Sequence, residues 1–134
     1  MNTSILKISD AASLALHTMV YLAKNPDRMV STREIAGALD VSENHLAKVR
    51  QRLAKAGLVD AARGPGGGFR LASDPENTTL LQIYETIEGT FKPVSCLLRK
   101  PACTGETCIL GGMIASVNEQ FLEYLQTTAL AALV

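Results

Sequence analysis

Apolar residues recur at helical spacing near the start of the chain. Four of them share one stripe within residues 9–24, at i, i+3, i+4 and i+7: Leu16, Met19, Val20 and Ala23. Asp10, Ser13 and His17 occupy a different face of the same predicted helix. Proline lacks a backbone donor and restricts the residue before it, so Asn25-Pro26-Asp27 predicts the end of this helix.

Two more helices, joined by a short turn, are predicted next. Ser31 and Glu34 form an S-x-x-E capping box that begins the second helix, and Ser42 is a suitable N-cap for the third. Gly57 ends the third helix, whose apolar stripe lies at i, i+3, i+7 and i+10: Leu46, Val49, Leu53 and Ala56. The other faces of this helix carry polar side chains: Asn44, His45, Lys48, Gln51, Arg52 and Lys55.

The pattern then changes to that of a β-hairpin. Residues 58–63 and 69–72 are strand candidates, and the glycine-rich residues 64–68 form a turn that needs the conformational freedom of glycine. A helix over about 79–88 follows, and after a polar loop over about 90–108 comes a long final helix. We therefore predict a mostly α fold, a winged helix-turn-helix with a small β-hairpin wing, plus a long C-terminal dimerisation helix.

Length and composition agree with such a fold. The 134 residues are 47% apolar and 19% charged, which is enough to form a core and excludes disordered, collagen-like and disulfide-rich secreted proteins. We expect a winged helix-turn-helix domain over residues 1–78 and a unit of cysteine loop and dimerisation helix over residues 79–134. Neither a secretory signal nor a transmembrane segment is visible, so we expect a cytoplasmic protein with reduced cysteines.

The net charge of zero conceals an asymmetry. Residues 31–72 carry seven basic and four acidic side chains, whereas residues 73–134 carry three basic and seven acidic ones. A basic working face on an otherwise acidic body would explain this difference. An excess of three positive charges over that first segment is modest, however, and chance explains it equally well.

A winged helix-turn-helix is suited to binding DNA. Its third helix can enter the major groove, and Arg63 and Arg70, which flank the wing tip, can reach phosphates or a minor groove. We predict these DNA-binding residues: Ser42, Asn44, His45, Lys48, Arg52, Arg63, Gly66 and Arg70. A solvated helix face or a permissive turn would explain each feature alone, but their order along the chain favours DNA binding.

Four stretches of the chain also match a known pattern. A wing signature is formed by Arg63-Gly64-Pro65-Gly66-Gly67-Gly68-Phe69 followed by Leu71. Residues 14–17 match a first helix, residues 41–49 match a recognition helix, and residues 127–134 match a C-terminal pattern. In these segments the chain resembles the Rrf-type transcription regulators, the IscR/NsrR family. The resemblance implies a homodimeric regulator of a double-stranded DNA operator, with no membrane partner. It implies dimerisation through the long helix, whose stripe is Ile114, Val117, Phe121, Tyr124 and Leu125.

Three cysteines lie in the loop before the long helix: Cys96, Cys103 and Cys108. Thiolates suit iron–sulphur clusters, zinc or copper(I), but the chain has no C-x-x-C pair, and three inert cysteines would be the simpler interpretation of the residues alone. The resemblance implies instead that the three ligate a [2Fe-2S] or [4Fe-4S] cluster. Their spacing departs slightly from the family's usual one, which leaves the type of cluster open.

A cluster held by three cysteines needs a fourth ligand. The histidine that follows the last cysteine in one branch of the family is replaced here by Gly111. The resemblance points to the first helix of the partner subunit, where His17 is the first choice and Asp10 the second. These two lie about 10 Å apart along the helix, so one iron cannot easily take both.

Together these features predict a regulator whose operator affinity is controlled by an iron–sulphur cluster that senses redox state, nitric oxide or iron–sulphur status. One alternative keeps the DNA-binding fold and replaces the cluster by a thiol or zinc switch. Another is a small iron–sulphur redox protein without DNA affinity. We expect no enzyme, because no nucleophile–base pair is visible and the glycine-rich segment lacks the Lys-Ser/Thr of a phosphate-binding loop.

Overall fold

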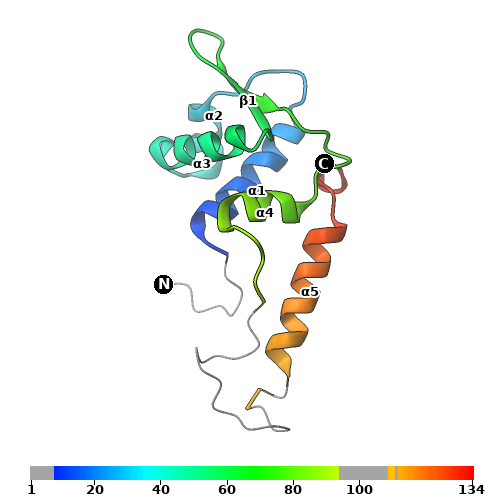
Figure 1. Cartoon of the computed structure of the whole chain (residues 1–134). Helices are drawn as coiled ribbons and strands as arrows, with labels where there is room; N and C mark the ends of the chain where they lie inside the picture. Colours follow the sequence, from blue (N-terminus) through cyan, green and yellow to red (C-terminus); the bar gives the residue numbers. More distant parts are fainter. Residues whose placement is uncertain (1–7, 94–108, 111) are drawn as a thin grey trace.

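The computed structural model describes residues 8–93, 109–110 and 112–134. Its described part is mostly helical with a two-stranded wing, which confirms the predicted fold (Figure 1). The elements in chain order are α1 (Asp10–Ala23), α2 (Thr32–Leu39), α3 (Glu43–Lys55), β1 (Val59–Ala62), β2 (Gly68–Leu71), α4 (Leu80–Glu88), α5 (Met113–Thr127) and the 3-10 turn η1 (Leu130–Leu133).

Hydroxyl side chains begin the first four helices. Ser9, Ser31 and Ser42 each accept a hydrogen bond from the backbone amide three residues further on, at the starts of α1, α2 and α3. Thr79 and Gln82 form a complete reciprocal capping box at the start of α4. These local bonds explain why the predicted helix starts lie within a residue of the observed ones.

The predicted capping box at α2 forms only in half. Ser31 Oγ accepts from the Glu34 amide, but the Glu34 carboxylate accepts from Arg28 Nη1 and Nη2 at 2.8 and 2.6 Å and from the Tyr21 hydroxyl at 2.7 Å. The guanidinium of Arg28 makes two bonds with a full positive charge, whereas the Ser31 amide would make one bond from an uncharged donor, which explains the exchange. Glu34 thereby ties α2 to α1 and to the loop between them.

Two glycines allow close backbone contacts at the wing, Gly67 within the wing itself and Gly68 against the loop before α2. β1 and β2 pair antiparallel, and Phe69 in β2 exchanges hydrogen bonds of 2.8 and 2.9 Å with Val30 in the loop before α2. A Cβ on Gly68, whose φ is +140°, would lie 2.3 Å from the Val30 carbonyl oxygen, and one on Gly67 would lie 2.5 Å from that of Ala62. The glycines therefore have a steric role beyond that of a permissive turn.

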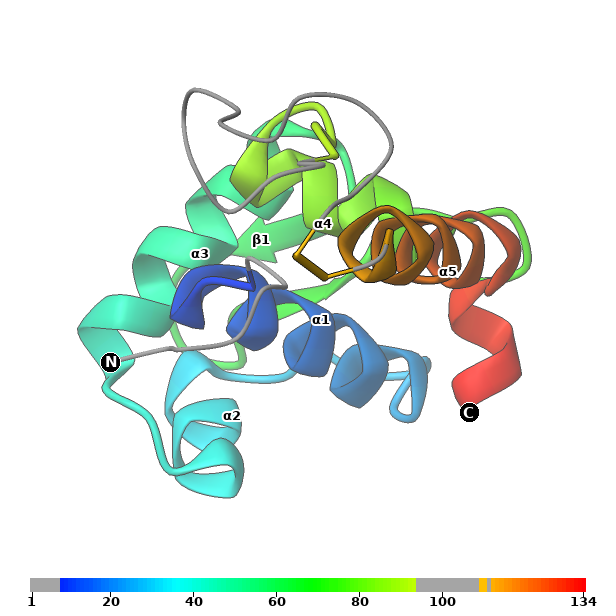
Figure 2. The ribbon, with the colours of Figure 1, turned by 90° about the horizontal axis from the view of Figure 1, so that it is seen from below.

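Helix α1 lies at the centre of one hydrophobic core, with α2, α3, α4 and β2 around it (Figure 2). Its fully buried apolar positions are Ala12, Ala15, Met19 and Leu22, whereas Leu16 and Val20 of the predicted stripe are only partly buried. Ala56 of the predicted α3 stripe is exposed, because it is the C-cap residue where the helix already ends. The core also takes in residues on both sides of the boundary predicted between residues 78 and 79.

The stripe of α5 predicted for dimerisation contains both buried and exposed residues. Ile114 and Leu125 are 5% and 3% exposed in the single chain, and the Phe121 ring meets that of Tyr84 in α4 edge-on at 5.7 Å. Tyr124 faces outward, at 54% exposed. The stripe falls mainly on the side of α5 that packs against its own chain. Among the described helices, none is long and apolar enough to cross a membrane.

Candidate nucleic-acid interface and the adjoining hollow

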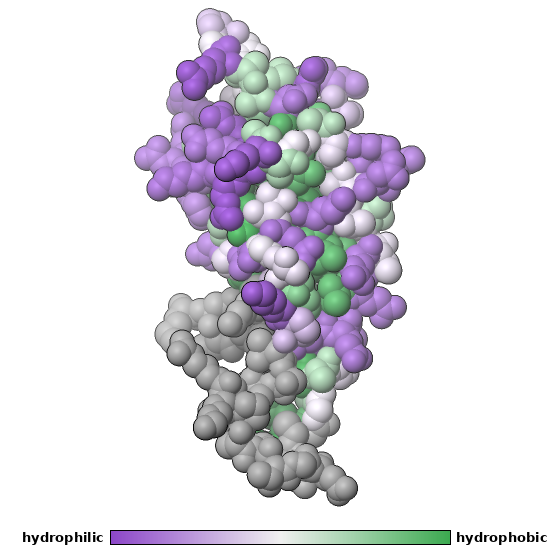
Figure 3. Space-filling model, in the orientation of Figure 1, coloured by the Kyte–Doolittle hydropathy of each residue, from purple (hydrophilic) through white to green (hydrophobic). Residues whose placement is uncertain are grey.

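The apolar side of α3 fixes the direction of its polar side. Leu46, Val49 and Leu53 are at most 2% exposed, so they anchor the helix in the core. The polar residues that were predicted to read DNA project from the rest of the helix surface, where hydrophilic side chains gather (Figure 3). Asn44 and Lys48 are exposed, and His45 is partly buried. Ser42 is exposed, and its hydroxyl oxygen accepts from the His45 amide at 2.9 Å.

The wing presents its two arginines to solvent. Arg63 follows β1, Arg70 lies in β2 opposite Asp60, and both are exposed. Gly66 at the tip has a φ of +75° and open space around the position of a Cβ. The predicted wing residues are thus accessible, as contacts with a phosphate backbone require.

Arg52 differs from the other predicted DNA-binding residues because it contacts α4. Its Nη2 donates to the Ile87 carbonyl at 2.6 Å and lies 3.4 Å from the Thr86 carbonyl. Both carbonyls belong to the last turn of α4, where backbone acceptors have no partner within the helix. The exposed guanidinium therefore serves as a cap for a neighbouring helix.

Arg50 positions the wing, a role that the sequence analysis missed. Its Nη1 donates to Thr32 Oγ1 at 3.1 Å, and its guanidinium lies 5.9 Å from the centre of the buried Phe69 ring. Arg50 thus connects α3 both to α2 and to β2. The sequence offers one indication of this role: Arg50 lies four residues after Leu46, at the edge of the apolar stripe of α3.

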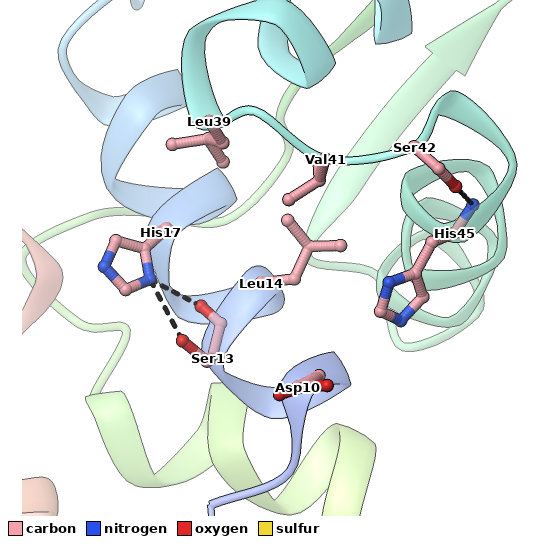
Figure 4. Close-up of a pocket in the computed structure, with 8 residues that line it drawn as sticks. All are labelled: Asp10, Ser13, Leu14, His17, Leu39, Val41, Ser42 and His45. Carbon is pink, nitrogen blue, oxygen red and sulfur yellow. Dashed lines mark hydrogen bonds between the residues drawn. The ribbon is translucent and has the colours of Figure 1, made fainter.

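A hollow of about 410 Å³ separates α1 from the turn between α2 and α3. Figure 4 shows the side chains that line it on both sides. From α1 come Asp10, Ser13, Leu14 and His17, and from the opposite side come Leu39, Val41, Ser42 and His45. The two candidate fourth ligands and two candidate DNA-binding residues, which the sequence analysis assigned to separate sites, therefore line the same space.

The His17 imidazole is oriented by its own helix. Its Nδ1 lies 2.7 Å from the Ser13 carbonyl oxygen and 3.4 Å from the Ser13 hydroxyl. Because a carbonyl only accepts, Nδ1 carries the proton in this contact and the lone pair of the neutral ring is on Nε2. A metal-bound histidine typically has this arrangement, with one nitrogen held by a carbonyl and the other available.

The predicted cysteine ligands are Cys96, Cys103 and Cys108, which lie outside the described residues, as does Gly111. Within the part of the chain that the structure describes, no three His, Cys, Asp or Glu side chains converge as a metal site. Asp10 and His17 therefore form no centre by themselves, and a site that includes either of them requires further donors.

Comparison with known proteins identifies this architecture. A model of the Rrf2 family, described as iron-dependent transcriptional regulators, matches residues 8–134. The chain belongs to the Rrf2 family. The resemblance found in the sequence is thereby confirmed, and the winged helix-turn-helix is that of a DNA-binding transcription regulator, a family that is not one of enzymes.

Two named relatives and a solved structure support the assignment. This Rrf2 chain is 32% identical to the HTH-type transcriptional regulator NsrR of Bacillus subtilis, over 90% of its own length and 82% of that protein. It is 44% identical to BadM of Rhodopseudomonas palustris over 85 residues, which are 63% of this chain and 54% of BadM. The structure of CymR, the global cysteine regulator of B. subtilis, matches with a TM-score of 0.77 at 30% identity and 94% coverage of both chains.

Proposed function

We propose that this Rrf2 regulator carries an iron–sulphur cluster, and that the cluster sets its affinity for an operator. The cluster would be held by Cys96, Cys103 and Cys108, with His17 of a partner subunit as the fourth ligand and Asp10 as the alternative. The family's description as iron-dependent supports a role for iron. The observation that carries the proposal is the hollow that His17 and Asp10 line together with His45 and Ser42.

The chemistry of the described donor, His17, fits such a group. The orientation of His17 leaves Nε2 as a neutral nitrogen donor, which is a known ligand type for iron–sulphur clusters. A bound cluster would supply iron that reacts with oxidants and with nitric oxide. His17 would hold it at the hollow, and Ser42 and His45 at the start of α3 form the opposite wall. A change in what occupies the hollow would therefore act directly on the beginning of the recognition helix.

DNA recognition would use the exposed surface of α3 and the wing. In a homodimer, two copies of α3 would enter successive major grooves about 34 Å apart. Asn44, His45 and Lys48 would face base edges and phosphates, and Arg63, Gly66 and Arg70 would approach the backbone beside the groove. For the dimer contact, α5 and the turn before it offer exposed apolar side chains: Ile109, Met113 and Tyr124.

Anaerobic purification of the whole chain tests the cluster. We expect visible absorbance together with iron and acid-labile sulphide, and a strong loss of all three in Cys103→Ser. His17→Ala should reduce the iron content or shift the visible bands, whereas Lys48→Ala, which changes an exposed position on α3, should leave the spectrum unchanged. Wild-type protein without sulphide or visible bands after anaerobic work would contradict the proposal.

A thiol or zinc switch at the same cysteines is the second candidate. The likeness to CymR, a global cysteine regulator, favours it, because that protein shares this fold over nearly the whole chain. The same preparation separates the two candidates. Zinc without sulphide would indicate a structural metal, and metal-free protein whose DNA affinity changes on thiol oxidation would indicate a thiol switch.

A further inference from the structure

The C-terminal end of α4 is a junction between three helices. Arg52 of α3 donates to the carbonyls of Thr86 and Ile87 in its last turn. The hydroxyl of Ser9, the N-cap of α1, donates to the Glu88 carboxylate. The recognition helix and the helix that carries Asp10 and His17 are thus both attached to the same turn of α4.

This turn also lies at the entry to the cysteine-bearing segment. Gly89, with a φ of +80°, ends α4 and donates its amide to the Glu85 carbonyl at 2.8 Å. The Phe91 amide donates to the Glu85 carboxylate, and the Phe91 ring packs against Tyr84 at a centroid distance of 6.0 Å. Only four residues of chain separate Phe91 from Cys96 in the sequence. In Figure 1 the chain leaves α4 below α3 and runs down from this junction.

The geometry of Arg52 fits a clamp better than a DNA contact. A guanidinium at the C-terminal end of a helix satisfies unpaired carbonyls and meets the negative end of the helix dipole. One of its bonds is as short as 2.6 Å, so a phosphate would have to displace a good charge-assisted interaction. Lys48 lies one turn earlier on the same side of α3 and is exposed, which makes it the matched candidate for a phosphate contact.

We infer that Arg52 is a positioning residue that clamps the recognition helix to the end of α4, and that through it the state of the cysteine-bearing segment reaches α3. The second part rests on the proposed function, because it requires that segment to exist in two states. The first part stands on the contacts of Arg52 alone. Arg52 would then control how α3 responds to the signal without itself touching DNA.

Salt dependence of DNA binding separates a clamp from a phosphate contact. The assay measures affinity of the full chain for a generic 30-base-pair duplex at several salt concentrations, for wild type, Arg52→Ala and Lys48→Ala. Each phosphate contact contributes about 0.9 to the slope of log affinity against log salt. We expect the slope to fall by about that amount in Lys48→Ala and to stay unchanged in Arg52→Ala. A slope reduced equally in both variants would overturn the inference.

Amide hydrogen exchange tests the clamp and its coupling directly. In Arg52→Ala, the amides of Gly89 and Phe91 should exchange faster than in wild type, and they should be unchanged in Lys48→Ala. In wild type, exchange within α3 should differ between the protein as purified anaerobically and the same protein after iron removal. Arg52→Ala should abolish that difference. If Arg52→Ala does not fold, Arg52→Lys is used in its place, because it keeps the positive charge but loses the planar guanidinium that bonds the carbonyls.

The outcomes keep the two proposals apart. Unchanged exchange at Gly89 and Phe91 in Arg52→Ala would overturn the clamp, whatever the cysteines bind. If amide exchange in α3 of the wild type is the same before and after iron removal, the coupling is overturned. A preparation without iron and sulphide contradicts the proposed function itself, before the coupling is tested. A difference in α3 exchange that survives in Arg52→Ala would show that the signal takes another route.

Discussion

Gly68→Ala should weaken the attachment of the wing to the loop before α2. The new Cβ would lie 2.3 Å from the Val30 carbonyl oxygen, and the residue would keep a φ of +140° that L side chains rarely adopt. Holding an L residue in such a sparsely populated backbone region costs about 1–3 kcal/mol. Relief of the clash would break the two Val30–Phe69 hydrogen bonds, worth about 0.5–1.5 kcal/mol each.

The total loss is roughly 2–6 kcal/mol in the free energy of unfolding, measured by urea denaturation monitored by circular dichroism. Gly66→Ala is the matched control. Its φ of +75° is also positive, but nothing lies within 4 Å of the added Cβ, so it should lose only the backbone part, about 1–2 kcal/mol. Equal losses in the two variants would refute the claim that the Gly68 position is set by contact with Val30.

Three further changes test other contacts of the fold. Hydrogen bonds from Arg28, and to a smaller extent from Tyr21, lower the pKa of Glu34 from 4.5 to about 2. The stability that Glu34 contributes is therefore present above pH 4.5 and is lost as the pH falls toward 2. Glu34→Gln should make the thermal unfolding temperature less sensitive to acid, and an unchanged pH profile would contradict the ion pair. Ser42→Ala should cost about 1 kcal/mol of stability by loss of the α3 N-cap, and Ser42→Asp should retain it. Arg50→Ala should lower the free energy of unfolding by about 1–2 kcal/mol and speed hydrogen exchange of the Phe69 amide. Arg33→Ala, at an exposed position of α2, should do neither.

The features that could be predicted from the sequence are local ones. Ser42 and Thr79 begin helices because each hydroxyl bonds to an amide three residues away, and such pairs are visible in the sequence itself. The hairpin was equally visible, because short apolar strands flank a run of glycines. The order of the helices, the wing and the family can therefore be predicted from the sequence.

The features that could not be predicted depend on how the helices pack. Arg52 bonds to a carbonyl 35 residues away, and its exposed position on α3 made a DNA contact the natural expectation. His17 and His45 come from different helices, and only the packing of α1 beside the turn before α3 brings them to one hollow. In the same way, α5 turns Leu125 toward its own core, which periodicity alone cannot distinguish from a face that meets a second copy.

The proposal that a cluster at the hollow governs DNA recognition is tested most directly by comparing operator affinity with and without iron. A duplex is first selected from a random library by the anaerobically purified protein, and its affinity is then measured at fixed salt before and after iron removal. The account predicts a change of at least about fivefold in wild type, the lower range for coupling between two sites. It also predicts that Cys103→Ser binds with the affinity of the iron-free form. Equal affinities of the iron-containing and iron-free wild-type protein would contradict it.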